Sequence, residues 1–79
     1  MLPTIGRTVG YVLPVTHRRA GEIVPAVITR IFSEGSTTVQ LTPFVDVAND
    51  EPVAAHDCSS VHYDEHAKTP RSWHWLARF

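Results

Sequence analysis

Cysteine is almost missing from this chain of 79 residues, which contains a single one, Cys58. One cysteine cannot form an internal disulfide, so the sequence excludes both a disulfide-stabilised scaffold and a four-thiolate zinc site. Long apolar runs are missing as well, and a bilayer crossing needs about 20 apolar residues in succession. The first residues show no basic segment followed by an apolar core, which argues against a secretory signal. We therefore expect no membrane segment and a location in the cytoplasm.

Glycine is also scarce, with residues at positions 6, 10, 21 and 35 that never cluster. Phosphate-binding loops are built from clustered glycines, so a loop of that kind is excluded. No stretch has the spacing of a helix of normal length. With 43% hydrophobic and 19% charged residues, the composition is that of one globular domain covering residues 1–79.

Neither sign of charge dominates, since the formal net charge is −1. The charges form blocks, however: residues 1–33 are basic, residues 46–65 contain acids without Lys or Arg, and the end of the chain is basic again. A duplex-binding domain is expected to be basic overall, so duplex nucleic acid is not the expected partner. Complementary blocks favour contacts between subunits, and we expect a homo-oligomer.

The first half of the chain predicts three strands. Residues 5–13 place apolar side chains at positions 5, 9, 11 and 13, with small residues at positions 6, 8 and 10. Residues 22–32 are almost continuously apolar and β-branched, which indicates a central strand, and we expect its regular pairing to begin after Pro25. Residues 37–44 alternate cleanly. Gly35 lies in a short hairpin connection, and the segment around Asn49 predicts a turn.

The second half predicts two more strands, at 59–63 and 72–78, joined by a polar loop at 64–71. Trp73 and Trp75 are expected on one face of the last strand and His74 on the other. Five short strands without a helix predict an all-β domain, a small and strongly bent antiparallel sheet or an SH3-like barrel, with the first strand beside the last. An open sheet completed by dimerisation is the alternative.

Several segments carry a resemblance to known proteins. They are Ile5 to Tyr11, Pro25 to Ile31, Val39 to Leu41, and above all Ser60-Val61-His62-Tyr63-Asp64-Glu65 with Pro70-Arg71-Ser72-Trp73-His74-Trp75. They resemble a group of small uncharacterised proteins encoded in tailed-bacteriophage genomes. The resemblance implies a phage setting and an early or accessory gene product. Pro70-Arg71-Ser72 stands where those proteins often have a glycine.

Metal binding and catalysis are weakly indicated. His56, Cys58, His62 and His66 are of zinc-binding types, but paired cysteines and a helical His-Glu-x-x-His motif are both missing. Cys58, Ser59 or Ser60 beside a histidine could be drawn as a dyad, yet a domain of this size rarely encloses the oxyanion site that such catalysis needs. We therefore expect no enzyme activity, no metal and no cofactor.

A nucleotide can also be held by a flat aromatic ring under the base and an arginine near the phosphate. The candidate rings are Tyr11, Tyr63, Trp73 and Trp75, and the candidate charges are Arg7, Arg30, Arg71 and Arg78. Because the loop 64–71 joins the last two strands, we expect a ligand to contact Tyr63, Asp64, Arg71, Trp73 and His74. The two tryptophans can equally fill the core, since each buries a large area.

Two functions remain open. The first is a non-enzymatic phage-encoded binding protein in the host cytoplasm, acting on a host protein or countering host defence by sequestering a nucleotide signal. The second is a small structural component of the phage head or tail. Aromatic, histidine and acidic residues gathered near the last loop favour the first.

Overall fold

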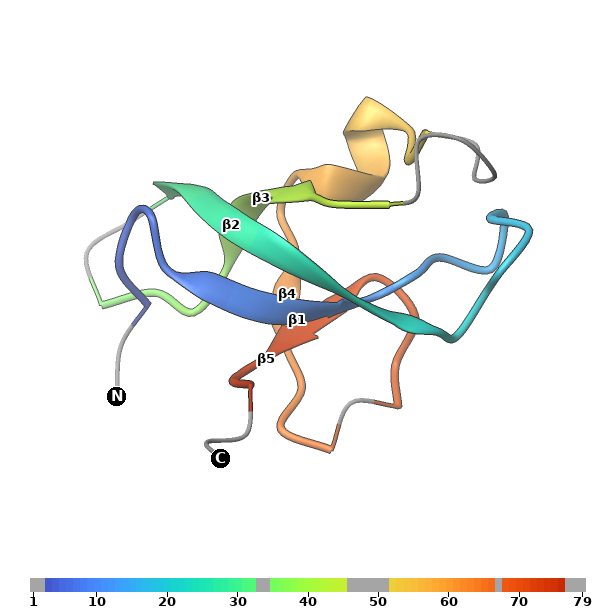
Figure 1. Cartoon of the computed structure of the whole chain (residues 1–79). Helices are drawn as coiled ribbons and strands as arrows, with labels where there is room; N and C mark the ends of the chain where they lie inside the picture. Colours follow the sequence, from blue (N-terminus) through green and yellow to red (C-terminus); the bar gives the residue numbers. More distant parts are fainter. Residues whose placement is uncertain (1–2, 33–34, 46–51, 67, 77–79) are drawn as a thin grey trace.

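The structure, a computed structural model, describes residues 3–32, 35–45, 52–66 and 68–76. It contains one five-stranded sheet with the strand order β3-β2-β1-β5-β4 (Figure 1). The elements are β1 Thr8–Val12, β2 Ile23–Ile31, β3 Val39–Pro43, a 3₁₀ turn η1 Ala55–Cys58, β4 His62–Tyr63 and β5 Ser72–His74. The prediction of a small, strongly bent, all-β sheet is confirmed, as is the pairing of the first strand with the last.

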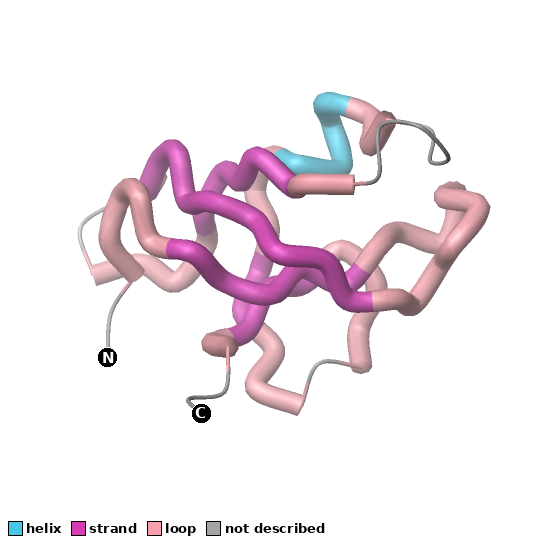
Figure 2. The backbone as a smooth tube through the Cα atoms, in the orientation of Figure 1, coloured by secondary structure: helices cyan, strands magenta, loops and turns pink. Residues whose placement is uncertain are grey.

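The sheet curls into a half-barrel whose two edge strands come together at one point. Val39 and Val61 exchange backbone hydrogen bonds of 3.0 and 2.8 Å, forming a single antiparallel bridge between the β3 edge and the start of β4. Figure 2 shows the strands gathered at the centre of the molecule, with loops and η1 around them. We call the line along which β3 and β4 face each other the seam.

The core lies on the inner face of this curl. In β1 the inward residues are Val9 and Tyr11, and Tyr11 stands opposite Trp73 of β5 in the β1–β5 register. Both aromatic side chains are fully buried. The remaining core residues are Leu13, Val24, Ala26, Ile28, Val39, Leu41 and Val61. A sheet this small therefore takes a large share of its buried area from two rings.

A β-bulge in β2 explains its irregular pattern of buried residues. The register with β3 shifts between Ile28 and Arg30, so Ile28 faces Leu41 while Ile31 faces Val39. A bulge of this kind lets two residues three positions apart both point inward, and it increases the local twist that curls the sheet. The alternation expected from the sequence is interrupted there for that reason.

Pairing at Pro25 differs in part from the prediction. On the β3 side it begins at Ala26 as expected, but on the β1 side it already includes Pro25, opposite Gly10. Backbone N and C=O of one strand residue point to the same side. The carbonyl of Pro25 points toward β3, where it accepts a hydrogen bond from Phe44 N at 2.8 Å. The N–H that proline lacks would also point toward β3. The hydrogen bonds between β2 and β1 are therefore unaffected by the proline.

The predicted antiparallel arrangement is wrong for the last two strands. β4 and β5 are parallel, with His62 beside Ser72 and Tyr63 beside Trp73, and the sheet is therefore mixed. Residues 64–71 form the crossover segment that returns the chain to the start of β5. Parallel neighbouring strands usually need a longer connection than these eight residues.

Several predicted strand ends are shorter in the structure. Ile5 is 69% exposed and precedes a turn at Gly6, whose φ of +88° suits glycine, so β1 begins at Thr8. The predicted strands 59–63 and 72–78 are reduced to β4 and β5, and residues 77–79 lie outside the described part of the chain. Residues 49–51 of the predicted turn and residues 33–34 of the predicted hairpin connection also lie outside it.

Candidate functional site

Three aromatic side chains, Tyr63, Trp73 and Trp75, line a hollow of about 240 Å³ together with Thr37, here called the aromatic groove. The ring centroids of Tyr63 and Trp73 are 4.8 Å apart, with a tilt of 57°. Those of Trp73 and Trp75 are 5.0 Å apart and the rings are nearly perpendicular, at 86°. Trp73 is fully buried, whereas Tyr63 is 37% exposed and Trp75 is half-buried. Tyr63 and Trp75 therefore offer free ring surface above a fixed Trp73.

The groove lies where the seam stops being paired. Continuing the antiparallel bridge of Val39 and Val61 by two residues would place Thr37 opposite Tyr63. Within the described part of the chain no bridge forms there. Instead, the indole N–H of Trp73 donates a 2.7 Å hydrogen bond to the carbonyl of Thr37. Trp73 thus replaces the missing backbone pair and holds the seam at a width that leaves space between β3 and β4.

A positive charge lies beside the groove. The guanidinium carbon of Arg7 is 5.4 Å from the ring centroid of Trp75, a distance typical of a cation–π contact. Arg7 is exposed and forms no ion pair with the described residues. Its charge is therefore available to an anionic group next to the rings.

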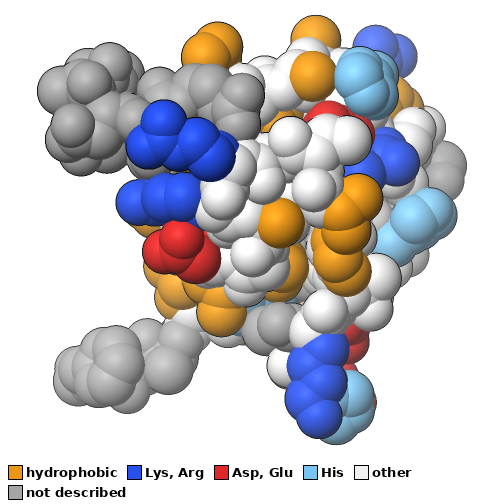
Figure 3. All heavy atoms as spheres, turned by 90° about the vertical axis from the view of Figure 1, so that its right-hand side faces the viewer, with side chains coloured by type: hydrophobic (Ala, Val, Ile, Leu, Met, Phe, Trp, Pro, Cys, Tyr) orange, Lys and Arg blue, Asp and Glu red, His pale blue; other side chains and the backbone are white. Residues whose placement is uncertain are grey.

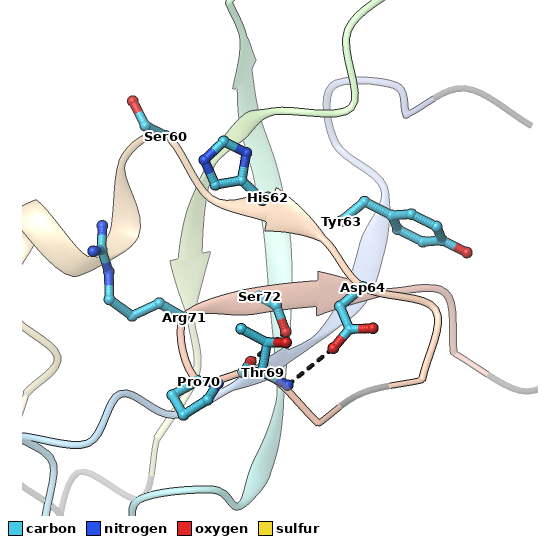
Figure 4. Close-up of a pocket in the computed structure, with 8 residues that line it drawn as sticks. All are labelled: Ser60, His62, Tyr63, Asp64, Thr69, Pro70, Arg71 and Ser72. Atoms are coloured by element: carbon cyan, nitrogen blue, oxygen red, sulfur yellow. Dashed lines mark hydrogen bonds between the residues drawn. The ribbon is translucent and has the colours of Figure 1, made fainter.

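A second and larger hollow, of about 610 Å³, lies between β4 and the crossover segment; we call it the polar hollow. Its lining is Ser60, His62, Tyr63, Asp64, Thr69, Pro70, Arg71 and Ser72. In Figure 4, Ser60 and His62 lie on one side of it and Thr69, Pro70 and Ser72 on the other, while the Tyr63 ring points away. The two hollows share Tyr63 and otherwise have separate linings.

Asp64 organises the crossover segment. Its Oδ1 accepts a hydrogen bond from His66 N, and its Oδ2 accepts bonds of 3.1 and 2.9 Å from Lys68 N and Thr69 N. These bonds, those from Thr69 above all, hold the pKa of Asp64 well below its ordinary range. The carboxylate therefore turns the chain after β4, and its acceptor capacity is used within the loop.

Arg71 is held by the turn η1. Its Nε lies 3.1 Å from Oδ1 of Asp57, and its terminal nitrogen donates to the carbonyl of His56 at 3.2 Å. The side chain of Asp57 is 7% exposed and that of Arg71 is 45% exposed. Tyr11 adds to this contact by donating its hydroxyl proton to the Asp57 carbonyl at 2.6 Å, and burial raises the pKa of Tyr11. Arg71 thus connects the crossover segment to η1.

His74 lies on the outer face of the sheet, against Gly10. A Cβ atom at Gly10 would stand 2.7 Å from Cε1 of the imidazole, closer than real Cβ contacts allow. Nδ1 of His74 is buried and has no hydrogen-bond partner among the described residues, and burial lowers the pKa of this histidine. The close contact explains why strand β1 has a glycine here.

The five predicted site residues are therefore divided. Tyr63, Asp64 and Arg71 border the polar hollow, Tyr63 and Trp73 border the aromatic groove, and His74 borders neither. The sequence did indicate Arg7 and Trp75 among the candidate charges and rings, and their place beside the groove follows from the pairing of β1 with β5. Thr37 and Asp57 were missed, because their contacts depend on the closure of the sheet.

The metal-binding types of side chain are dispersed. Among the described residues, no group of three or more His, Cys, Asp or Glu side chains could hold a metal ion. Cys58 places its sulfur 3.5 Å from the Ala54 carbonyl, and burial together with the nearby Asp57 raises the pKa of its thiol. A thiol of that kind stays protonated and is a poor nucleophile at neutral pH.

The surface is mixed in charge. Figure 3 shows basic and acidic side chains and small apolar groups interspersed over one face of the molecule. Such a face lacks the single-sign field that attracts a nucleic-acid duplex.

No helix within the described ranges is long and apolar enough to cross a membrane. Comparison with family models, with curated proteins and with solved structures gives no match to this chain.

Proposed function

We propose that this protein is a non-enzymatic binding protein for a nucleotide-type ligand, whose base enters the aromatic groove. The observation that carries the proposal is the placement of two accessible rings and a free arginine at the open part of the seam. Stacking suits every base because each has a flat π face, and an arginine beside the rings adds attraction for a phosphate.

The dimensions support a single ring in the groove. Sites for drug-sized ligands usually measure about 300–1,000 Å³, and the groove is smaller, at about 240 Å³. One base would therefore occupy it, while the sugar and phosphate would lie outside, on the side of Arg7. Base stacking on aromatic side chains contributes about 1–3 kcal/mol per base, so one ring and one charge correspond to moderate affinity.

The experiment is a calorimetric titration with cyclic dinucleotides, adenosine-ribose compounds, mononucleotides and short single strands. Arg7→Gln removes the charge beside Trp75 and is expected to weaken binding of phosphorylated ligands several-fold while leaving nucleosides unaffected. Arg30→Gln is the matched control, because Arg30 lies 5.4 Å from the Phe32 ring in the same kind of contact away from the groove. Failure of every ligand to bind, or equal losses in both variants, would contradict the proposal.

For the cellular role, we propose that the ligand is a nucleotide signal of the infected host and that the protein acts there by sequestering it. The support is the resemblance to phage proteins together with the aromatic groove. Mass spectrometry of purified particles provides the test: a sequestering protein is expected to be missing from them, whereas a structural component would be present in many copies.

A further inference from the structure

We propose that the polar hollow binds a neutral sugar ring, through neighbouring hydroxyl groups of a saccharide or of the ribose of a nucleotide. This site is separate from the aromatic groove and goes beyond base binding there. Three observations about its lining support the proposal: its backbone strain, its compensated charges and its remaining polar groups.

Backbone strain is concentrated at this hollow. Among the described residues, Ser60 and Arg71 are the two that are not glycine and yet have positive φ, at 55° and 61°. Both line the polar hollow. Conformations of this kind cost of order 1–3 kcal/mol each and cluster at binding and active sites. Both residues of this kind therefore lie at one hollow, as is common at binding sites.

The charges around the hollow are already compensated. The Asp64 carboxylate accepts three backbone N–H bonds, and Arg71 is paired with Asp57. An ionic ligand would have to compete with these internal partners. A neutral ligand that needs hydrogen bonds rather than charge is therefore favoured over a phosphate or a cation.

The groups that remain are suited to hydroxyls. Nδ1 of His62 lies 3.2 Å from the Thr38 hydroxyl, and the other ring nitrogen, Nε2, has no hydrogen bond within the described part of the chain. The Ser60 hydroxyl is exposed and has no hydrogen bond within the described part of the chain. An imidazole nitrogen and a hydroxyl can each donate or accept, which matches the adjacent hydroxyls of a sugar. The volume, about 610 Å³, falls within the usual range for small-molecule sites.

The experiment is a titration of ¹⁵N-labelled protein, followed by NMR, with ribose, glucose and galactose, and separately with AMP and dAMP. Shifts at residues 60–64 and 68–72 with the free sugars support a saccharide site. A several-fold preference for AMP over dAMP, without shifts from free sugars, supports the ribose of a nucleotide. No shift from any sugar together with equal affinity for AMP and dAMP overturns the proposal, although nucleotide binding in the aromatic groove would still stand.

Two variants test the lining. His62→Ala is expected to weaken sugar binding at least fivefold, and the matched control His66→Ala, an exposed histidine of the crossover segment outside the lining, is expected to leave it unchanged. Ser60→Gly removes a hydroxyl and relieves positive φ, so it is expected to raise the melting temperature while it weakens binding. Unchanged sugar binding in both His62→Ala and Ser60→Gly would overturn the proposal.

Discussion

Arg71 combines an unfavourable backbone conformation with a favourable side-chain contact, and substitutions can separate the two. Its φ of +61° is one that glycine adopts without strain. Its guanidinium, in contrast, is the partner of the buried Asp57 carboxylate at 3.1 Å. Arg71→Ala removes the contact and keeps the strain, whereas Arg71→Gly removes both.

The two contributions can be estimated. Hydrogen bonds to charged groups contribute about 1.5–3 kcal/mol, and the half-exposed Arg71 places this pair toward the lower end, at about 2 kcal/mol. A left-handed conformation costs a residue with a Cβ atom about 1–2 kcal/mol, so Arg71→Gly is expected to be more stable than Arg71→Ala by roughly 1 kcal/mol. For a domain of this size, 1 kcal/mol corresponds to about 4–8 °C in melting temperature.

The assay is urea and thermal unfolding of wild type, Arg71→Ala, Arg71→Gly, Asp57→Asn and the double variant Asp57→Asn/Arg71→Ala. The double variant is expected to be more stable than the sum of the single losses predicts, because the two side chains contact each other. The reasoning fails if Arg71→Ala is as stable as wild type, or if Arg71→Gly is less stable than Arg71→Ala.

Three further predictions concern the outer face, pH and assembly. Gly10→Ala is expected to destabilise the wild type by about 1–2 kcal/mol, because the added methyl group overpacks against His74. The same substitution is expected to cost nothing in a His74→Ala background. Thermal unfolding of the wild type, the two single variants and the double variant tests this. Burial lowers the pKa of His74 from its ordinary 6.5, so the unfolded chain binds a proton before the folded chain does as the pH falls below 6.5. The free energy of unfolding should therefore decrease with falling pH in that range. His74→Gln should abolish this pH dependence, and His66→Gln should keep it. Complementary charge blocks predict self-association, which sedimentation at micromolar concentration tests, and a purely monomeric species would contradict it.

Local pattern was sufficient for much of this fold. Alternation and β-branched residues located β2 and β3 within one or two residues, and the spacing of Trp73 and Trp75 placed both rings on one face. The direction of β4 relative to β5 was not predictable from that pattern, because it depends on Asp64 binding three amides and on Arg71 taking a left-handed conformation.

The candidate sites were harder to predict than the strands. The rings and arginines were identified by type, but Thr37 meets Trp73 across 36 residues and Asp57 meets Arg71 across the crossover segment. Contacts of this kind form when the sheet closes, and no periodicity of the sequence encodes them. His74 was expected on the face opposite Trp73, free to contact a ligand. It does lie on that face, but it packs against Gly10 and borders neither hollow.

The single bridge of Val39 and Val61 also determines how the molecule fluctuates. Opening the seam requires the loss of two backbone hydrogen bonds, the bond between Trp73 and Thr37 and the exposed contact between Thr38 and His62, whereas the β1–β2 ladder contains five residue pairs. Amide protons at positions 39 and 61 should therefore exchange with solvent through local openings, well before those of β1 and β2. A ligand held between Thr37 and Tyr63 would slow that exchange, so the exchange rate of these two amide protons measures how often the aromatic groove opens.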